Sequence, residues 1–185
     1  GQYGFLQVEP DHYARLLPDI GLDSADAIVA ALADRVRSAV DGEVKVARFG
    51  EHSFALLLEG SHARTKAVAE ALRDAIATHV FSVGARSVAV TASIGGVQVG
   101  EKIASVPQIL ARASGCLHAA VELGGNTLQV FDPGAADRAE EERIARWVER
   151  LREALTGEGF VLHYQPVLCL HGDGAELYEA HLRIE

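Results

Sequence analysis

The segment at residues 48–54, Arg-Phe-Gly-Glu-His-Ser-Phe, carries three consecutive side chains that could take part in chemistry. Glu51 offers a carboxylate, His52 an imidazole that can exchange protons near neutral pH, and Ser53 a hydroxyl. Apolar runs lie on both sides, EVKVA before the segment and ALLLE after it. This pattern predicts a β-hairpin with a tight turn at Gly50. The triplet is therefore a reactive group, the remains of one, or a solvated turn.

Composition limits the classes of function. The chain has 185 residues, 49% hydrophobic and 23% charged, which is typical of one soluble globular domain with a smaller addition. We expect no membrane segment and no signal peptide, because no apolar run approaches about 18 residues. A net charge of −9 argues against nucleic acid as a partner. Cys116 and Cys169 have no CxxC spacing, so we expect reduced thiols and a cytoplasmic protein.

The elements that must position the triplet alternate between strands and helices. Strands are predicted at residues 4–9, on both sides of the hairpin at 43–59, and at 80–84, 87–99 and 127–131. Helices are predicted from Pro10 to Leu17, from Asp23 or Ser24 onward, at 63–79, and from Ser105 to Gly124. This order predicts an α/β fold with a mixed central sheet.

A different segment begins at Asp132. Residues 136–155 are charged and carry one apolar stripe, which predicts an amphipathic connecting helix with Trp147 as its packing anchor. Two strands are expected at 160–170 and 175–184, joined by a turn at HGDG. Such strands alone would leave apolar side chains and strand edges uncovered. We therefore expect the helix to dock through Trp147, and the strands to pack on their own domain or to pair with another copy.

Four sequence motifs in the same order resemble the GGDEF domain of diguanylate cyclases. Residues 48–54 match R-[YF]-G-G-[DE]-E-F, and residues 9–21 match D-x-D-x-F-K-x-[IL]-N-D-x-x-G. TASIGGV at 91–97 and the run at 112–131 match two further signatures. The resemblance covers roughly residues 4–131, so we assign 1–131 to a GGDEF-like domain. It implies a mixed five-stranded sheet flanked by helices.

The resemblance also implies an activity, the joining of two GTP molecules by metal ions that carboxylates hold. The two metal-binding acids of the family match Glu9 and Ser53 here. Ser53 has no charge and coordinates Mg²⁺ poorly, while His52 replaces the preceding acid with an imidazole, a poor ligand for a hard cation. We therefore expect no catalytic residue, no metal and no cofactor.

The nucleotide-binding positions that the resemblance implies are changed as well. Glu51 replaces the second glycine, whose lack of Cβ lets the backbone approach phosphate. Leu17 matches the guanine-reading asparagine, and Val121 and Gly125 match the phosphate-binding lysine and arginine. Asp26 matches the acid of the family's guanine site. Without the other residues of that site, its simpler interpretation is a surface or capping residue.

Three interpretations of the hairpin tip follow. In the first, the degenerate motif Gly50, Glu51, His52, Ser53 and Phe54 is a turn without catalytic or phosphate-binding function. In the second, Glu9, Glu51 and His52 form a new metal site. In the third, the domain retains some binding of GTP. We favour the first.

The end of the chain resembles the start of an EAL domain, the barrel of cyclic-di-GMP phosphodiesterases. FVLHYQPV at 160–167 and EAHLR at 179–183 match F-x-L-x-[YF]-Q-P-I and E-[AV]-L-L-R, except that His181 replaces a leucine. We assign 132–157 to the connecting helix and 158–185 to this EAL fragment. The implied ligand-binding positions, in an incomplete site, are Gln165, Glu179 and Arg183.

These observations predict a regulatory or scaffold domain of a cyclic-di-GMP signalling protein, similar to the FimX-type GGDEF–EAL proteins of type IV pili and twitching motility. Its expected partners are cyclic di-GMP, bound through the complete EAL domain of the parent protein, and proteins of the signalling pathway; a homodimer is a further possibility. The alternatives are part of a GGDEF–EAL phosphodiesterase or a weakly active diguanylate cyclase.

Overall fold

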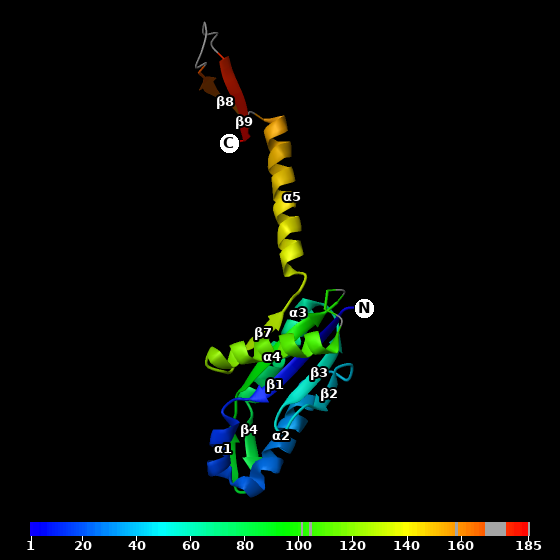
Figure 1. The fold of residues 1–185 in the computed structure, drawn as a ribbon. Helices are drawn as coiled ribbons and strands as arrows, with labels where there is room; N and C mark the ends of the chain where they lie inside the picture. Colours follow the sequence, from blue (N-terminus) through cyan, green and yellow to red (C-terminus); the bar gives the residue numbers. More distant parts are fainter. Residues whose placement is uncertain (101, 104, 158, 169–176, 185) are drawn as a thin grey trace. The chain divides into compact units, whose positions relative to one another are not determined.

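The computed structural model describes residues 1–100, 102–103, 105–157, 159–168 and 177–184. The chain divides into two compact units, Gly1–Pro133 (unit 1) and Gly134–Glu185 (unit 2), as Figure 1 shows.

Unit 1 is built on a mixed five-stranded sheet. Its strands are β1 (Tyr3–Pro10), β2 (Lys45–Arg48), β3 (Phe54–Glu59), β6 (Ala92–Val99) and β7 (Leu128–Phe131). They lie in the order β2-β3-β1-β6-β7, with β6 and β7 parallel and the other neighbours antiparallel. This confirms the predicted mixed sheet, in which β1 is the central strand and carries Glu9 near its end.

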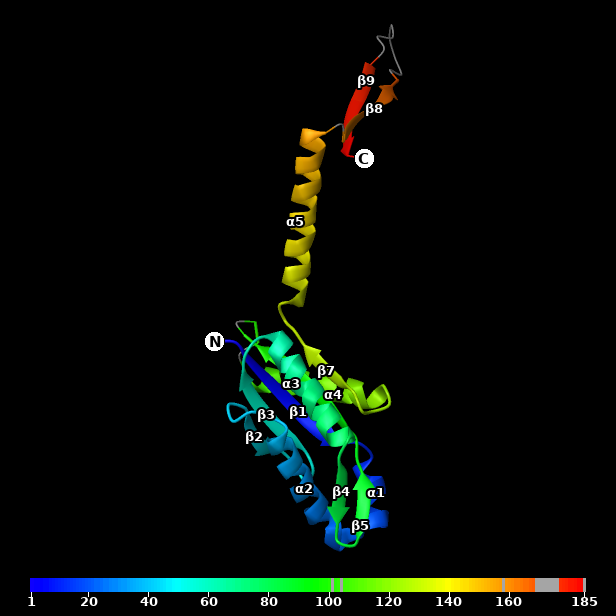
Figure 2. The same ribbon diagram turned by 180° about the vertical axis from the view of Figure 1, so that it is seen from behind.

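Helices cover both faces of the sheet. On one face lie α2 (Ala25–Ser38) and α3 (His62–Ala77), and on the other lies α4 (Val106–Glu122), as the two views in Figures 1 and 2 show. Residues of α2, α3 and the sheet form the larger core, while α4 packs against β6 so closely that a Cβ on Gly95 would lie 2.2 Å from Ala113 O. Only glycine permits this approach of helix and strand.

The prediction of a single strand at 87–99 is wrong. The chain instead forms β5 (Arg86–Ala89), which pairs with β4 (Val80–Val83) in a separate hairpin, and then starts β6 at Ala92. The break lies at Thr91, whose carbonyl oxygen accepts a hydrogen bond from Asp11 N at 2.8 Å and whose hydroxyl donates to Asp11 Oδ2 at 2.7 Å. A contact with a distant loop therefore ends the first strand.

The first helix is longer than expected. We predicted that it would end at Leu17, but α1 (Tyr13–Ile20) continues through Pro18 and is followed by a short 3₁₀ turn, η1 (Leu22–Ser24). Proline removes one helical hydrogen bond, a modest loss when the helix ends two residues later. Ile20 is buried, and its packing against the core holds the last turn.

Unit 2 consists of a long helix and a two-stranded hairpin. These are α5 (Ala135–Thr156), β8 (Phe160–Val167) and β9 (Leu177–Ile184), and the two strands pair antiparallel. Trp147 is half exposed, has the Arg150 guanidinium 5.3 Å from its ring centre, and lines a pocket with residues 181–184. The expected HGDG turn and the end of the first strand at 169–170 lie outside the described residues. No helix of the described chain is long and apolar enough to cross a membrane.

Candidate functional site

A cleft of about 700 Å³ lies in unit 1 where β1 meets α1, beside the β2–β3 turn and the end of α4. It is large enough for a nucleotide-sized ligand. The cleft brings together six of the positions singled out in the sequence: Glu9, Leu17, Glu51, His52, Val121 and Gly125. These residues lie up to 116 positions apart in the chain, and the fold brings them to one cleft.

The central contact of the cleft joins His52 to Glu9. His52 Nε2 lies 2.9 Å from Glu9 Oε1, and the ring of Tyr13 stacks on the imidazole with 4.3 Å between centroids and 13° between planes. His52 Nδ1 is buried and has no hydrogen-bond partner within the described part of the chain. In the neutral imidazole the proton therefore belongs on Nε2, where it is donated to the carboxylate.

Asp11 fixes the loop that carries Glu9 and Tyr13. Its Oδ1 accepts a hydrogen bond from Ser93 Oγ at 2.6 Å, and its Oδ2 accepts from Thr91 Oγ1 and Asn126 N, both at 2.7 Å. The loop thus joins the start of β6 and the turn before β7. The sequence analysis missed this role, although Asp11 is the second acid of the D-x-D pattern.

The loop also turns sharply. His12, between β1 and α1, has φ +54° in the left-handed region, which histidine enters more readily than most residues. The side chains that follow it in α1 are thereby directed back toward the cleft, where Tyr13 meets the hairpin residue His52.

The hairpin tip is closed by its own backbone. Phe49 N and Gly50 N donate to Ser53 O at 2.9 and 3.4 Å, and Arg48 donates to Gly50 O at 3.1 Å and to Glu51 O. Ser53 is 9% exposed, and its Oγ lies against Gly50, where an added Cβ would be 2.7 Å away. The serine hydroxyl therefore lies inside the turn.

The two residues beside this serine face opposite environments. Glu51 is exposed at the edge of the cleft, whereas Phe54 is 2% exposed and belongs to the core. The aromatic end of the motif therefore anchors the hairpin, and the acid at its tip is exposed to solvent.

The donor set does not fit the metal ions that the resemblance implies. One carboxylate, Glu9, is engaged by His52, and the second acid is replaced by the buried Ser53. Within the described residues, no group of three or more His, Cys, Asp or Glu side chains is placed to hold a metal ion. The alternative site formed by Glu9, Glu51 and His52 is therefore not found.

The cleft is electrostatically unsuited to a triphosphate. Among the residues that the structure describes, its lining has no lysine or arginine but three carboxylates, those of Glu9, Asp11 and Glu51. A phosphate oxygen about 4 Å from one such carboxylate would be repelled by on the order of 4 kcal/mol at an effective dielectric of about 20. Val121 and Gly125 also line the cleft, and neither side chain carries a charge.

Asp26 does not belong to this lining. It is exposed in the first turn of α2, a helix whose N-cap residue is Ser24. The charge of Asp26 nevertheless acts on Tyr13. Burial raises the pKa of the Tyr13 phenol, and the negative charge of Asp26 raises this pKa further.

The three EAL-type positions lie on the hairpin of unit 2. Gln165 and Glu179 are direct cross-strand partners, and Arg183 lies four residues beyond Glu179 on the same face of β9. His181 Nε2 is 3.7 Å from Glu179 Oε2. All three positions are exposed, so the hairpin presents them together on one face.

The sequence model of the family described as "Diguanylate cyclase, GGDEF domain" matches residues 1–127 of this chain. The chain belongs to the GGDEF family. The five-stranded sheet with helices on both faces is the fold of its solved members.

Three proteins of Pseudomonas aeruginosa illustrate the relationship. Cyclic di-GMP phosphodiesterase NbdA is 28% identical over 178 residues, which cover 94% of this chain and 22% of NbdA. The FimX GGDEF domain is 28% identical, with a TM-score of 0.64 over 70% of this chain and 79% of that one. Diguanylate cyclase SiaD, solved with its activator SiaC, is 25% identical, with a TM-score of 0.65 over 70% of this chain and 50% of that one. The chain spans about a quarter of the length of the curated relatives it matches.

Proposed function

We propose that this chain is a degenerate GGDEF domain that regulates or supports a cyclic-di-GMP signalling protein without making cyclic di-GMP itself. The observation that carries the proposal is the pair formed by His52 and Glu9. An imidazole occupies the coordination space of the remaining metal-binding carboxylate, and imidazole is a poor ligand for Mg²⁺. Without that ion, neither the attacking 3′-oxygen nor the triphosphate is activated.

The charge of the cleft supports the same conclusion. Phosphoryl transfer depends on cations that stabilise the transferring phosphate, and the lining supplies only carboxylates and imidazoles. Leu17 lines the cleft, and its side chain offers no hydrogen bond at the position where the resemblance implies a guanine-reading asparagine. The cleft therefore offers neither the cations that would bind the triphosphate of GTP nor the hydrogen bond that would bind its guanine base.

A regulatory role requires partners elsewhere in the protein. We infer that the parent protein continues as an EAL domain, because the 178-residue match to NbdA is longer than unit 1 and must extend into α5 and the hairpin. Cyclic di-GMP would then bind to the complete EAL domain, near Gln165, Glu179 and Arg183. Proteins of the pathway, or a second copy of the chain, would bind the GGDEF domain; the similar protein SiaD is known in complex with a protein activator, SiaC.

The location and pathway form part of the same proposal. We propose a cytoplasmic location and a role in type IV pili and twitching motility, which the resemblance of the sequence motifs to FimX-type proteins implies. The second candidate function is a GGDEF–EAL phosphodiesterase, which the name of NbdA favours. In that case unit 1 would control hydrolysis that takes place in the barrel.

Calorimetry with GTP and Mg²⁺ tests the inactive cleft. We expect no saturable binding of GTP to the chain at concentrations up to about 1 mM, which corresponds to less than about 4 kcal/mol of binding free energy. The Glu9→Ala variant is the matched control and should give the same trace. Micromolar affinity that disappears in Glu9→Ala would contradict the proposal.

A further inference from the structure

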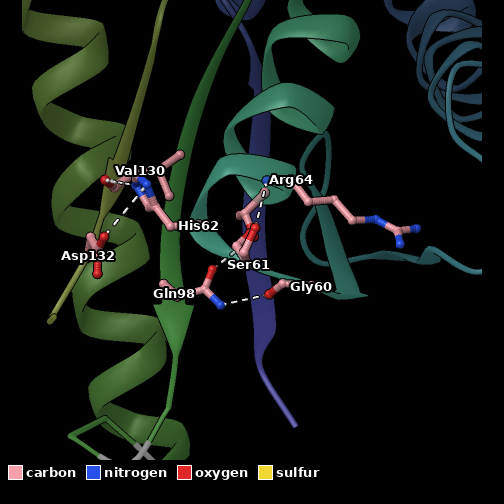
Figure 3. A network of polar contacts seen from close by, with 8 residues as sticks. Gly60, Ser61, His62, Arg64, Gln98, Val130 and Asp132 are labelled. Atoms are coloured by element: carbon pink, nitrogen blue, oxygen red, sulfur yellow. Dashed lines mark hydrogen bonds and ion pairs between the residues drawn. The ribbon is translucent and has the colours of Figure 1, made fainter. Parts of the chain in front are cut away.

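A histidine at the start of α3 contacts the segment through which the chain leaves unit 1. Figure 3 shows the His62 ring between the carbonyl of Val130 and the carboxylate of Asp132. His62 Nε2 lies 3.3 Å from Val130 O, and His62 Nδ1 lies 3.7 Å from Asp132 Oδ2. The Asp132 side chain is only 9% exposed. We name these three residues the exit clasp, since α5 begins three residues after Asp132.

Buried polar contacts fix the N-terminal end of α3, which carries His62. Thr65 Oγ1, on the first turn of α3, lies 3.0 Å from both Ser61 O and Gln98 Oε1, and Gln98 Nε2 donates to Gly60 O at 2.8 Å (Figure 3). Thr65 is fully buried. The N-terminus of α3 is therefore tied to β6, and the backbone of His62 has a fixed position.

Both partners of His62 can only accept hydrogen bonds. A carbonyl oxygen and a carboxylate carry no proton to donate, and a neutral imidazole has a single N–H. Neutral His62 can donate this single N–H to Val130 O, and it then has no charge that attracts Asp132. The imidazolium keeps an N–H toward Val130 O and adds a positive charge, which attracts the Asp132 carboxylate across the 3.7 Å of an ion pair.

Other charges around His62 are directed elsewhere. The strands β6 and β7 contain no charged residue, and Glu9 of β1 lies at the far end of its strand. On α3, Arg64 pairs with Asp41 and Glu43 and points away from the clasp (Figure 3), and Lys66 pairs with Glu70.

Two cations of the helices α2 and α4 have other partners. Arg35 of α2 donates to Ala75 O at the other end of α3, and Arg112 of α4 stacks on Phe131 from the opposite face of the sheet. In the described part of the chain, Asp132 is thus the carboxylate that faces His62.

We propose that the exit clasp is a pH-dependent device that sets the mobility of the segment joining unit 1 to α5. The clasp is closed when His62 is protonated, and it loosens when the imidazole becomes neutral. Histidine is the side chain whose ordinary change of charge lies nearest to neutral pH. The inference does not depend on whether the cleft is catalytic.

Backbone ¹⁵N relaxation of the whole chain tests the device. We expect the order parameters of Asp132, Gly134 and Ala135 to be near 0.85 at about pH 5.5 and to fall to about 0.6 at about pH 8. In His62→Gln, whose amide does not titrate, the values should be the same at both pH values. Asp132→Asn, which removes only the charge, should show a smaller change than the wild type.

His118→Gln is the matched control, because His118 is an exposed histidine of α4 paired with Glu122 and should leave the wild-type change intact. Constant order parameters in the wild type would overturn the proposal without reference to any variant. A wild-type response retained in folded His62→Gln would do the same. The ¹⁵N shifts of the His62 ring provide a second measurement, and a ring that does not change charge across this range would also overturn it.

Discussion

His52 Nε2 and Glu9 Oε1 are 2.9 Å apart, so the hairpin imidazole occupies the space in front of the one carboxylate retained from the family's metal site. The two side chains are 28% and 38% exposed, and a pair of this exposure contributes at most about 1 kcal/mol to stability. Its importance is therefore chemical. The pair determines what the Glu9 carboxylate can bind.

Asp11 should contribute more to stability than any other acid of the cleft. Asp11→Ala would leave the Ser93 hydroxyl, the Thr91 hydroxyl and Asn126 N without their acceptor. We expect the free energy of unfolding to fall by about 3 kcal/mol, since hydrogen bonds to charged groups are worth about 1.5–3 kcal/mol each and water replaces part of them. Urea unfolding followed by circular dichroism measures the change.

Asp34→Ala is the control for that prediction. Asp34 is an exposed acid of α2 whose side chain is 83% exposed in its pair with Arg37. Its loss should change the free energy of unfolding by less than about 1 kcal/mol. Equal effects of the two substitutions would show that the Asp11 contacts do not hold the loop.

Two adjacent glycines provide a test of the close approach at Asp11. Gly124 and Gly125 both have positive φ, +108° and +80°, but only a Cβ on Gly125 would meet a neighbour, the Asp11 carboxylate at 2.8 Å. Gly124→Ala should cost about 1 kcal/mol of stability from backbone strain alone. Gly125→Ala should cost about 2–4 kcal/mol, because the carboxylate must also move. Thermal unfolding that ranks the two variants in the reverse order would contradict the geometry of this turn.

Tyr13 should make unit 1 less stable in alkali. Burial raises the pKa of its phenol above the ordinary value of 10.0, and the charge of Asp26 raises it further. Because the folded state holds this proton more tightly than the unfolded state, the contribution is fully present below about pH 10 and is lost as the pH rises through the folded value. Tyr13→Phe should flatten the fall in stability above about pH 10, as urea titrations at several pH values would show. An unchanged fall would assign the effect to other groups.

The sequence predicted the hairpin and the mixed sheet, because local patterns carry that information. It did not predict the break before β6, since the valines at period two continue through Thr91 while the contact that ends the strand comes from Asp11, 80 positions away. Such a contact has no local signal. The continuation of α1 through Pro18 was missed for a similar reason, because the burial of Ile20 outweighs the proline.

The sequence also did not predict which side chains contact one another within the site. Tyr13 occupies an aromatic position of the motif, but its stacking on His52 depends on the left-handed turn at His12. His62 lies outside every motif, and only the folded chain places it against Val130 and Asp132. Contacts of this kind form between elements, after the local structure is set.

Production of cyclic di-GMP from GTP in the presence of Mg²⁺ or Mn²⁺ tests the central claim most directly. The wild-type chain should give no more product than a control without protein. Ser53→Glu, which restores only the second acid, should give none either, because the Glu51, Leu17, Val121 and Gly125 positions still supply neither a phosphate cation nor a base contact. Product above the control that is abolished by Glu9→Ala would contradict the account and identify the chain as an active cyclase.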